Sequence, residues 1–161
     1  MDVRTNWNAI RKHFNNSFRS NFHVSIASVD HESHPTVTPI GSLFINDDQT
    51  GFYFEKYPQK LPKHAEENSN ICVLCVNSSS GLWLKSLFKN KFSNYPGIKL
   101  YGQLGNKRNA TDRELDRLRR RMRATNLLKG NTYLWGDMQY VREVTFTKAE
   151  KINLGKMTND L

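Results

Sequence analysis

The residues with the most obvious chemical potential are two cysteines. Cys72 and Cys75 have CxxC spacing, which in a loop is typical of a metal site or a redox-active dithiol. They lie, however, within the continuous apolar run 71–76, which predicts a central strand. Side chains three residues apart on a strand point to opposite faces, so these thiols cannot share a metal ion or a disulfide. We therefore predict two core cysteines.

Other patterns of catalytic or metal-binding residues are missing from the sequence. It contains no GxGxxG, Walker, HExxH or GxSxG motif. The histidines lack the spacing of metal ligands and are expected at the surface, so no metal site is predicted; they are His13, His23, His31, His34 and His64.

The segment 35–45 has the pattern of a strand but contains two residues that weaken one. Pro39 cannot donate a hydrogen bond to a neighbouring strand, and Gly41 has no side chain to pack. Two interpretations follow. The segment is either a corner or bulge of a barrel, or a stretch of open backbone against which a flat ligand can lie.

A second candidate site follows the strand expected over 51–57. Pro62 suits the first position of a short helix over 62–68, and Leu61 in front of it is a poor N-cap. The first-turn N–H groups would then lack a partner within the chain. Together with the helix dipole and the Lys60 ammonium they predict an anion site suited to a phosphate. The alternative is a solvated lysine in a loop.

Two basic segments allow more than one interpretation. The segment 111–125 predicts a helix that begins with a capping box from Thr111 to Glu114. Its arginines either bind nucleic-acid phosphates or form a solvated face. Residues 82–92, within the aromatic and basic insertion 77–97, form a nucleobase platform, a membrane-surface element, or a segment buried against the barrel or a partner subunit. The ridge on the helix comprises Arg113, Arg117 and Arg121, with Arg119, Arg120 and Arg123 beside it.

Length and composition limit the class of protein. The chain has 161 residues, of which 37% are hydrophobic, so we expect one domain, 1–161, with a single core. It has no apolar run near the ~20 residues of a membrane span and no apolar signal segment near its start. We therefore expect a cytoplasmic protein. The 24 Lys and Arg against 15 Asp and Glu give a net charge of +9, which favours anionic partners.

Strands dominate the predicted secondary structure. An apolar stripe at helical spacing predicts an N-terminal helix over 1–19, and 35–57 predicts a β-hairpin. Six strands, or seven if 152–154 is one, with few helices favour a small antiparallel β-barrel with peripheral helices. The expected strands are 22–29, 35–45, 51–57, 71–76, 98–104 and 140–146.

The order of these elements, with several short strings, resembles the pyridoxamine 5'-phosphate oxidase-like family, the FMN-binding split β-barrels. The resemblance runs from about residue 22 to residue 157. It implies a mainly β fold with a six- to seven-stranded antiparallel split barrel. The strings are PTVTPIGS at 35–42, GFYF at 51–54, QK at 59–60, IKLYG at 98–102 and WGD at 135–137.

The resemblance also implies a cofactor and a partner. Members of the family bind FMN in a cleft between two identical subunits, so we expect a homodimeric flavoprotein, an oxidoreductase of unknown substrate. Carried over by position, the site would comprise Thr38, Pro39, Ile40, Gly41 and Ser42 along the flavin ring, Tyr53 and Phe54 beside the cofactor, Gln59 and Lys60 at its phosphate, Lys99 on the next contacting strand, and Trp135 stacking from the partner subunit.

The sequence departs from the oxidases that give the family its name. Thr38 and Leu43 stand where those enzymes carry Arg and Lys, and Gln59 stands where Arg is usual. Their C-terminal arginine signature is not found after Lys151. The resemblance is therefore to a branch distinct from the true pyridoxamine phosphate oxidases. The alternatives are a non-catalytic module that binds a polyanion such as nucleic acid, and a site for haem or a deazaflavin.

Overall fold

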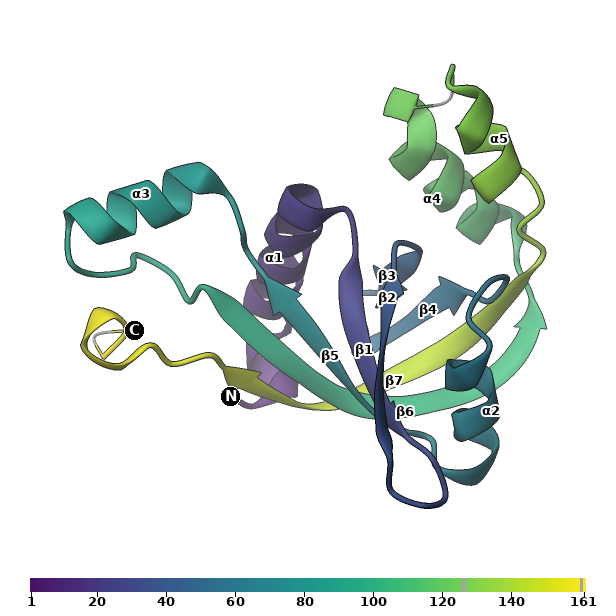
Figure 1. Cartoon of the computed structure of the whole chain (residues 1–161), viewed down its shortest axis with the longest axis horizontal. Coiled ribbons are helices and arrows are strands. Elements are labelled where there is room, and N and C mark those ends of the chain that lie inside the picture. The colour runs from purple at the N-terminus through teal and green to yellow at the C-terminus, as the bar shows by residue number, and fades with distance from the viewer. Residues whose placement is uncertain (126, 160) are drawn as a thin grey trace.

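Seven antiparallel strands form one curled sheet in the order β2-β1-β5-β6-β7-β4-β3 (Figure 1). A computed structural model describes residues 1–125, 127–159 and 161 of the chain. The long strands β6 and β7 cross the whole molecule and carry the shorter ones. The expected antiparallel split barrel with peripheral helices is confirmed. The strands are β1 Val24–Val29, β2 Pro35–Ile40, β3 Leu43–Ile45, β4 Thr50–Phe54, β5 Asn70–Val76, β6 Gly97–Asn109 and β7 Tyr140–Lys151.

The described part of the chain also contains five α-helices and two short 3-10 turns, which lie around the sheet. Within that part, none of the helices combines the length and apolar character needed to cross a membrane. The helices are α1 Val3–Asn21, α2 Lys60–Glu67, α3 Ser80–Phe88, α4 Asp112–Met122 and α5 Lys129–Trp135, and the turns are Arg123–Thr125 and Gly155–Met157.

The barrel turns a corner within the segment expected to be one strand, 35–45. Up to Ile40 the chain pairs with β1, and from Leu43 it pairs with β4. Strands β2 and β3 therefore form opposite ends of the sheet order although only two residues join them. The prediction of a single strand over 35–45 was wrong, and the interpretation of Pro39 and Gly41 as a barrel corner is confirmed. Of the hairpin expected over 35–57, only β3 and β4 pair with each other. A chain that lacks a donor and a side chain at these positions changes pairing partner at little cost.

Helix α1 lies against the curled sheet and directs the predicted apolar stripe into the core. Trp7, Ile10, Phe14 and Phe18 are all buried, and the Trp7 indole donates a hydrogen bond to the Asn46 carbonyl at 2.8 Å. A second apolar cluster lies outside the barrel wall, beneath α4, where the helix begins with the predicted capping box. This cluster contains Phe44, Phe52, Phe54, Leu118, Met138 and Val141.

Several boundaries differ from those expected. Residues 152–154 form no strand. The Ile152 N–H donates to the carbonyl of Gly97, which is the first residue of β6, so the residues after Ile152 have no β6 residue to pair with. Helix α2 begins two residues early, at Lys60, since a proline is tolerated throughout a first turn whose N–H groups have no acceptor in the helix. Helix α5 was not predicted, because Gly130 and its polar neighbours are weak helix formers.

The insertion 77–97 contains α3, which projects from one end of the molecule (Figure 1). Trp83 packs edge-on against the buried Phe92, with 5.2 Å between ring centroids. The expected burial against the barrel was wrong for the outer face of the helix, because Leu84, Leu87 and Phe88 are exposed. The two cysteines of β5 are free thiols on opposite faces, as predicted. Cys75 is in the core, but the core prediction was wrong for Cys72, which is half-buried.

Candidate functional site: a hollow at the barrel corner

A hollow of about 280 Å³ lies at the corner between β2 and β3. Its lining combines the corner itself, the end of β4 with the loop that follows, and the end of α5 with its own loop. Most of the lining is apolar, and the hydroxyls of Thr38 and Ser42 are its polar side-chain groups besides Tyr57 and Trp135. The lining residues are Thr38, Pro39, Ile40, Gly41, Ser42, Phe54, Tyr57, Pro58, Trp135 and Met138.

The absence of a side chain at Gly41 gives the hollow its shape. A Cβ at this position would lie 3.3 Å from Cη2 of Trp135 and 3.5 Å from the Phe22 carbonyl oxygen. A larger residue would therefore push the indole away from the backbone. The Tyr57 hydroxyl lies 3.1 Å from the carbonyl oxygens of both Tyr133 and Leu134, which holds α5 against the loop after β4. The Trp135 indole therefore packs directly against the backbone at Gly41, and together they form one wall of the apolar hollow.

The corner is also tied to the neighbouring strand. The Ser42 hydroxyl lies 3.3 Å from the Phe54 carbonyl oxygen and accepts from the Phe54 N–H at 3.2 Å. Thr38 is half-buried, and no hydrogen bond is recorded for its hydroxyl within the described chain. That hydroxyl is therefore available to a bound molecule.

Helix α2 begins directly beyond the hollow. Gln59 is its N-cap without a side-chain hydrogen bond to the first turn, and Pro58, one residue earlier, lines the hollow. The expected lack of a capping side chain is confirmed, although Leu61 is not the N-cap. The helix is anchored by His64, whose Nδ1 lies 3.0 Å from the buried Ser28 hydroxyl. The expected surface position was wrong for this histidine, which is buried because α2 packs it against β1. The free N–H groups and the exposed Lys60 therefore stand at a fixed place beside the corner.

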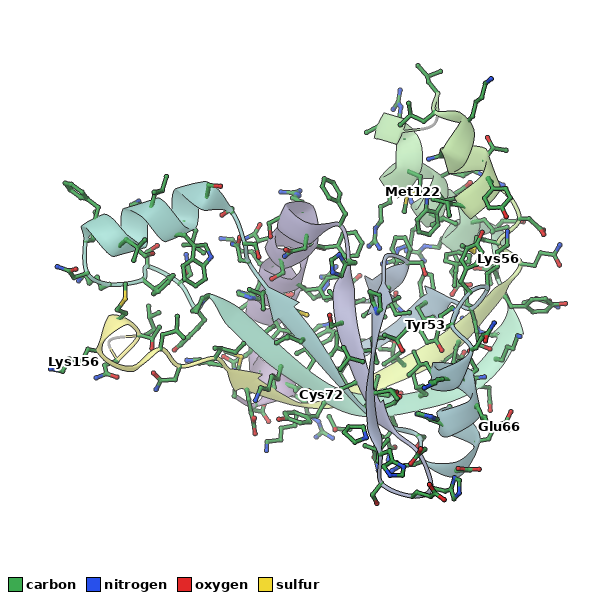
Figure 2. All side chains as sticks on the ribbon, in the orientation of Figure 1. Tyr53, Lys56, Glu66, Cys72, Met122 and Lys156 are labelled. Carbon is green, nitrogen blue, oxygen red and sulfur yellow. The ribbon has the colours of Figure 1, made fainter. Side chains whose placement is uncertain are left out.

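The structure brings seven of the eleven predicted site residues around one hollow: Thr38, Pro39, Ile40, Gly41, Ser42, Phe54 and Trp135. Gln59 and Lys60 are exposed next to it. Tyr53, labelled in Figure 2, is completely buried in the core. Lys99 is exposed on β6, and strands β1 and β5 lie between β6 and β2 in the sheet. Trp135 reaches the hollow of its own chain. Sequence reasoning missed Tyr57, Pro58 and Met138, which are neighbours in sequence of the QK and WGD strings.

A buried ionic network lies just past the hollow, at the end of β4. The Glu55 carboxylate receives Nε and Nη2 of Arg142 and, at 2.9 Å, the Tyr53 hydroxyl, and Lys107 lies 3.4 Å away. Burial alone would raise the pKa of Glu55, but hydrogen bonds from Arg142 and Tyr53 hold that pKa below its usual value. Burial and the adjacent carboxylate raise the pKa of Tyr53 far above its usual range. These groups are paired with one another and therefore support the strand rather than face a ligand.

The chemistry of the hollow is that of a binding site. Among its lining residues, all within the described chain, there is no histidine, cysteine, carboxylate or lysine, and the Tyr57 hydroxyl is turned toward backbone carbonyl oxygens 3.1 Å away. In the same part of the chain, no three metal-ligating side chains converge on a point where an ion could bind. Reactivity at this site would have to be supplied by a bound cofactor.

Comparison with solved structures identifies the architecture. An FMN-binding protein from Syntrophomonas wolfei superimposes with a TM-score of 0.60 at 16% identity, over 94% of this chain and 95% of that one. The chain has the split-barrel fold. A protein from Lactobacillus delbrueckii named as a candidate pyridoxamine 5'-phosphate oxidase matches with a TM-score of 0.52 at 15% identity, over 86% and 91%. The haem storage protein HutZ from Vibrio cholerae matches with a TM-score of 0.54 at 10% identity, over 94% and 95%.

No protein-family model and no curated protein sequence matches the chain. The fold expected from the resemblance to FMN-binding split barrels is confirmed by structure alone. At these identities the likeness establishes the fold, and the ligands of the similar proteins do not carry over with it.

Proposed function

We propose that this protein binds FMN in the corner hollow and is a flavin-dependent oxidoreductase. The observation that carries the proposal is the juxtaposition of a largely apolar hollow with an uncapped helix N-terminus and Lys60. An isoalloxazine ring needs the first, and a phosphate group needs the second. FMN contains both groups in one molecule.

The chain's own residues would hold the cofactor in different ways. The backbone from Thr38 to Ser42 and the rings of Phe54 and Trp135 would contact the flavin, with the Thr38 hydroxyl free to hydrogen-bond its edge. The N–H groups at the start of α2 and the Lys60 ammonium, with Gln59 beside them, would bind the phosphate. Bound FMN would supply hydride or electron transfer, and the protein would orient it and exclude water.

A second copy of the chain would complete the site. The hollow of about 280 Å³ is at the lower end of the range for small-molecule pockets, roughly 300–1,000 Å³. The outer face of β1, β2, β5 and β6 carries the exposed apolar side chains Val37 and Leu74. We propose that this face packs against its counterpart in a homodimer and brings further residues to the cofactor. Lys99 lies on this face and would reach FMN only in such an assembly.

Haem and a deazaflavin are the competing cofactors. Haem iron in proteins is held by His, Cys, Met or Tyr. Within the described chain the lining of the hollow offers only the buried Met138 and Tyr57, whose hydroxyl already bonds two carbonyls. This lining favours a flavin over haem.

The test is a titration of the purified protein with FMN, followed by the flavin absorption and fluorescence. Lys60→Ala should weaken FMN binding about tenfold or more, as expected for a lost charge-assisted hydrogen bond of about 1.5–3 kcal/mol. Lys85→Ala, which removes the same charge from the exposed helix α3, should leave the affinity unchanged. Light scattering should give the mass of a dimer.

Two results would contradict the proposal. A protein that neither contains nor takes up FMN would refute it, and a Soret band after addition of hemin would replace FMN with haem. Equal affinity in wild type and Lys60→Ala would refute the phosphate site alone.

A further inference from the structure

A groove between α1 and α4, separate from the corner hollow, is lined by four arginines. It has a volume of about 420 Å³ and shares no lining residue with the hollow. No acidic residue is among its lining residues, all of which belong to the described chain. The lining residues are Asn15, Phe18, Arg19, Phe44, Arg117, Arg120 and Arg121.

Two of these arginines are held in place by uncharged groups. Arg121 donates to the Leu43 carbonyl at 2.6 Å, and its guanidinium lies 3.4 Å from the ring centroid of Phe44 and 4.1 Å from that of Phe18. Arg117 donates to the Ile45 carbonyl at 2.9 Å and to the Asn46 side chain at 2.6 Å. The expected solvated face was therefore wrong for both residues. They are ordered against the edge of β3, whose outer carbonyls would otherwise lack partners.

The nearby carboxylates are bound to other cations. Asp116 pairs with Arg119 at 2.6 Å, Glu114 pairs with Arg108 at 2.8 Å, and Asp47 pairs with Arg11 at 2.5 Å. Within the described chain the groove itself has no acidic lining residue, and its positive charge is offset only by carboxylates outside it, such as Glu114 and Asp47 near Arg117.

This crowding is unfavourable for the free protein. Burial, and then repulsion from Arg117, lower the pKa of Arg121 to about 9. Burial, and then repulsion from Arg113, also lower the pKa of Arg117. A bound anion would relieve this repulsion, and its contacts would be strengthened by the low local dielectric.

We propose that the groove binds a small, multiply charged phosphate anion, of the kind carried by a polyphosphate or a nucleotide. Guanidinium groups bind phosphate oxygens through paired N–H donors. Arg117 and Arg121 are already ordered, and the exposed Arg19 and Arg120 can close on the anion from α1 and α4. Arginines from two helices converge on one groove, which favours a compact anion that all four can contact at once.

The experiment is calorimetric titration with sodium triphosphate at low salt. Arg19→Gln and Arg120→Gln should each weaken triphosphate binding about tenfold, the loss of one charge-assisted contact. Arg119→Gln is the matched control, because it removes the same charge from an exposed residue of α4 that does not line the groove. It should change the affinity less than twofold. Thermal melts report whether each variant is folded. Because Arg19 and Arg120 lie on different helices, one folded variant is enough to test the proposal if the other does not fold.

Three results would overturn the proposal. One is no binding of triphosphate to the wild type at low salt. Another is an equal loss in Arg119→Gln and Arg120→Gln, which would show diffuse attraction. The third is tighter binding of a single-stranded oligonucleotide, weakened alike by all three substitutions, which would indicate an extended polyanion surface. Triphosphate binding should persist in Lys60→Ala, so that failure here and failure of the flavin site are distinguishable.

Discussion

The buried pair of Glu55 and Arg142 permits a quantitative prediction about stability. Their side chains are only 4% and 12% exposed, and removing one member of a buried ion pair costs about 3–5 kcal/mol. In Arg142→Met the carboxylate keeps its contacts with Tyr53 and Lys107. We therefore expect a loss near the lower limit, about 3 kcal/mol, in the free energy of unfolding measured with urea at neutral pH.

The pH dependence of this loss provides an independent check. The lowered pKa of Glu55 in the folded protein means that its contribution is present above the unfolded value of 4.5 and is lost as pH falls through the folded pKa. Arg142→Met removes the hydrogen bonds from Arg142 that counteract the effect of burial, so the pKa of Glu55 should be higher in the variant than in the wild type. The stability difference between the two proteins should therefore shrink as the pH falls below 4.5.

A double-mutant cycle separates the pair from its surroundings. Glu55→Gln with Arg142→Met should cost about 2 kcal/mol less than the sum of the single substitutions, because neither then leaves a buried charge unpaired. A loss in Arg142→Met below about 1 kcal/mol, the value of a surface pair, would refute the reasoning. So would a difference that does not change with pH.

Two further predictions concern the hollow and the capping box. Gly41→Val should reduce FMN affinity by at least about tenfold, because the valine side chain would press against the Trp135 indole in the wall of the hollow. Gly81→Val, at a position with open space around it, should not change the affinity, and equal FMN titrations for the two variants would contradict the proposed ring site. Thr111→Ala should lower the urea unfolding free energy by about 1 kcal/mol, because the helix loses its N-cap. Thr111→Ser keeps the hydroxyl and should retain most of the unfolding free energy. An equal loss of unfolding free energy in Thr111→Ala and Thr111→Ser would contradict the role of the Thr111 hydroxyl as N-cap.

Local sequence signals were sufficient where one element alone determines the outcome. The apolar stripe of α1, the capping box of α4 and the central strand β5 are all found where the sequence predicts them. Each depends on side chains a few residues apart, whose spacing sets the periodicity of a helix or strand. The same applies to Cys72 and Cys75, which strand periodicity alone places on opposite faces.

The corner and the groove were decided by tertiary structure. Pro39 and Gly41 indicate that the strand is weakened, but the separation of its two halves to opposite ends of the sheet depends on β5, β6 and β7, which lie between β1 and β4 in the sheet order. The ridge of Arg117 and Arg121 has the pattern of a solvated helix face, yet both reach carbonyls of β3 more than seventy residues earlier. Long side chains and exposed strand edges find each other only after the sheet has curled.

The candidate site divides along the same line. The sequence alone predicts a split-barrel protein with a weakened strand at Pro39 and Gly41 and an anion site near Lys60. Only the tertiary structure brings Trp135 against Gly41, leaves Tyr53 in the core and Lys99 on the outer face. The physical reason is that a motif specifies local backbone geometry, whereas the walls of a binding site are set by the packing of segments distant in sequence.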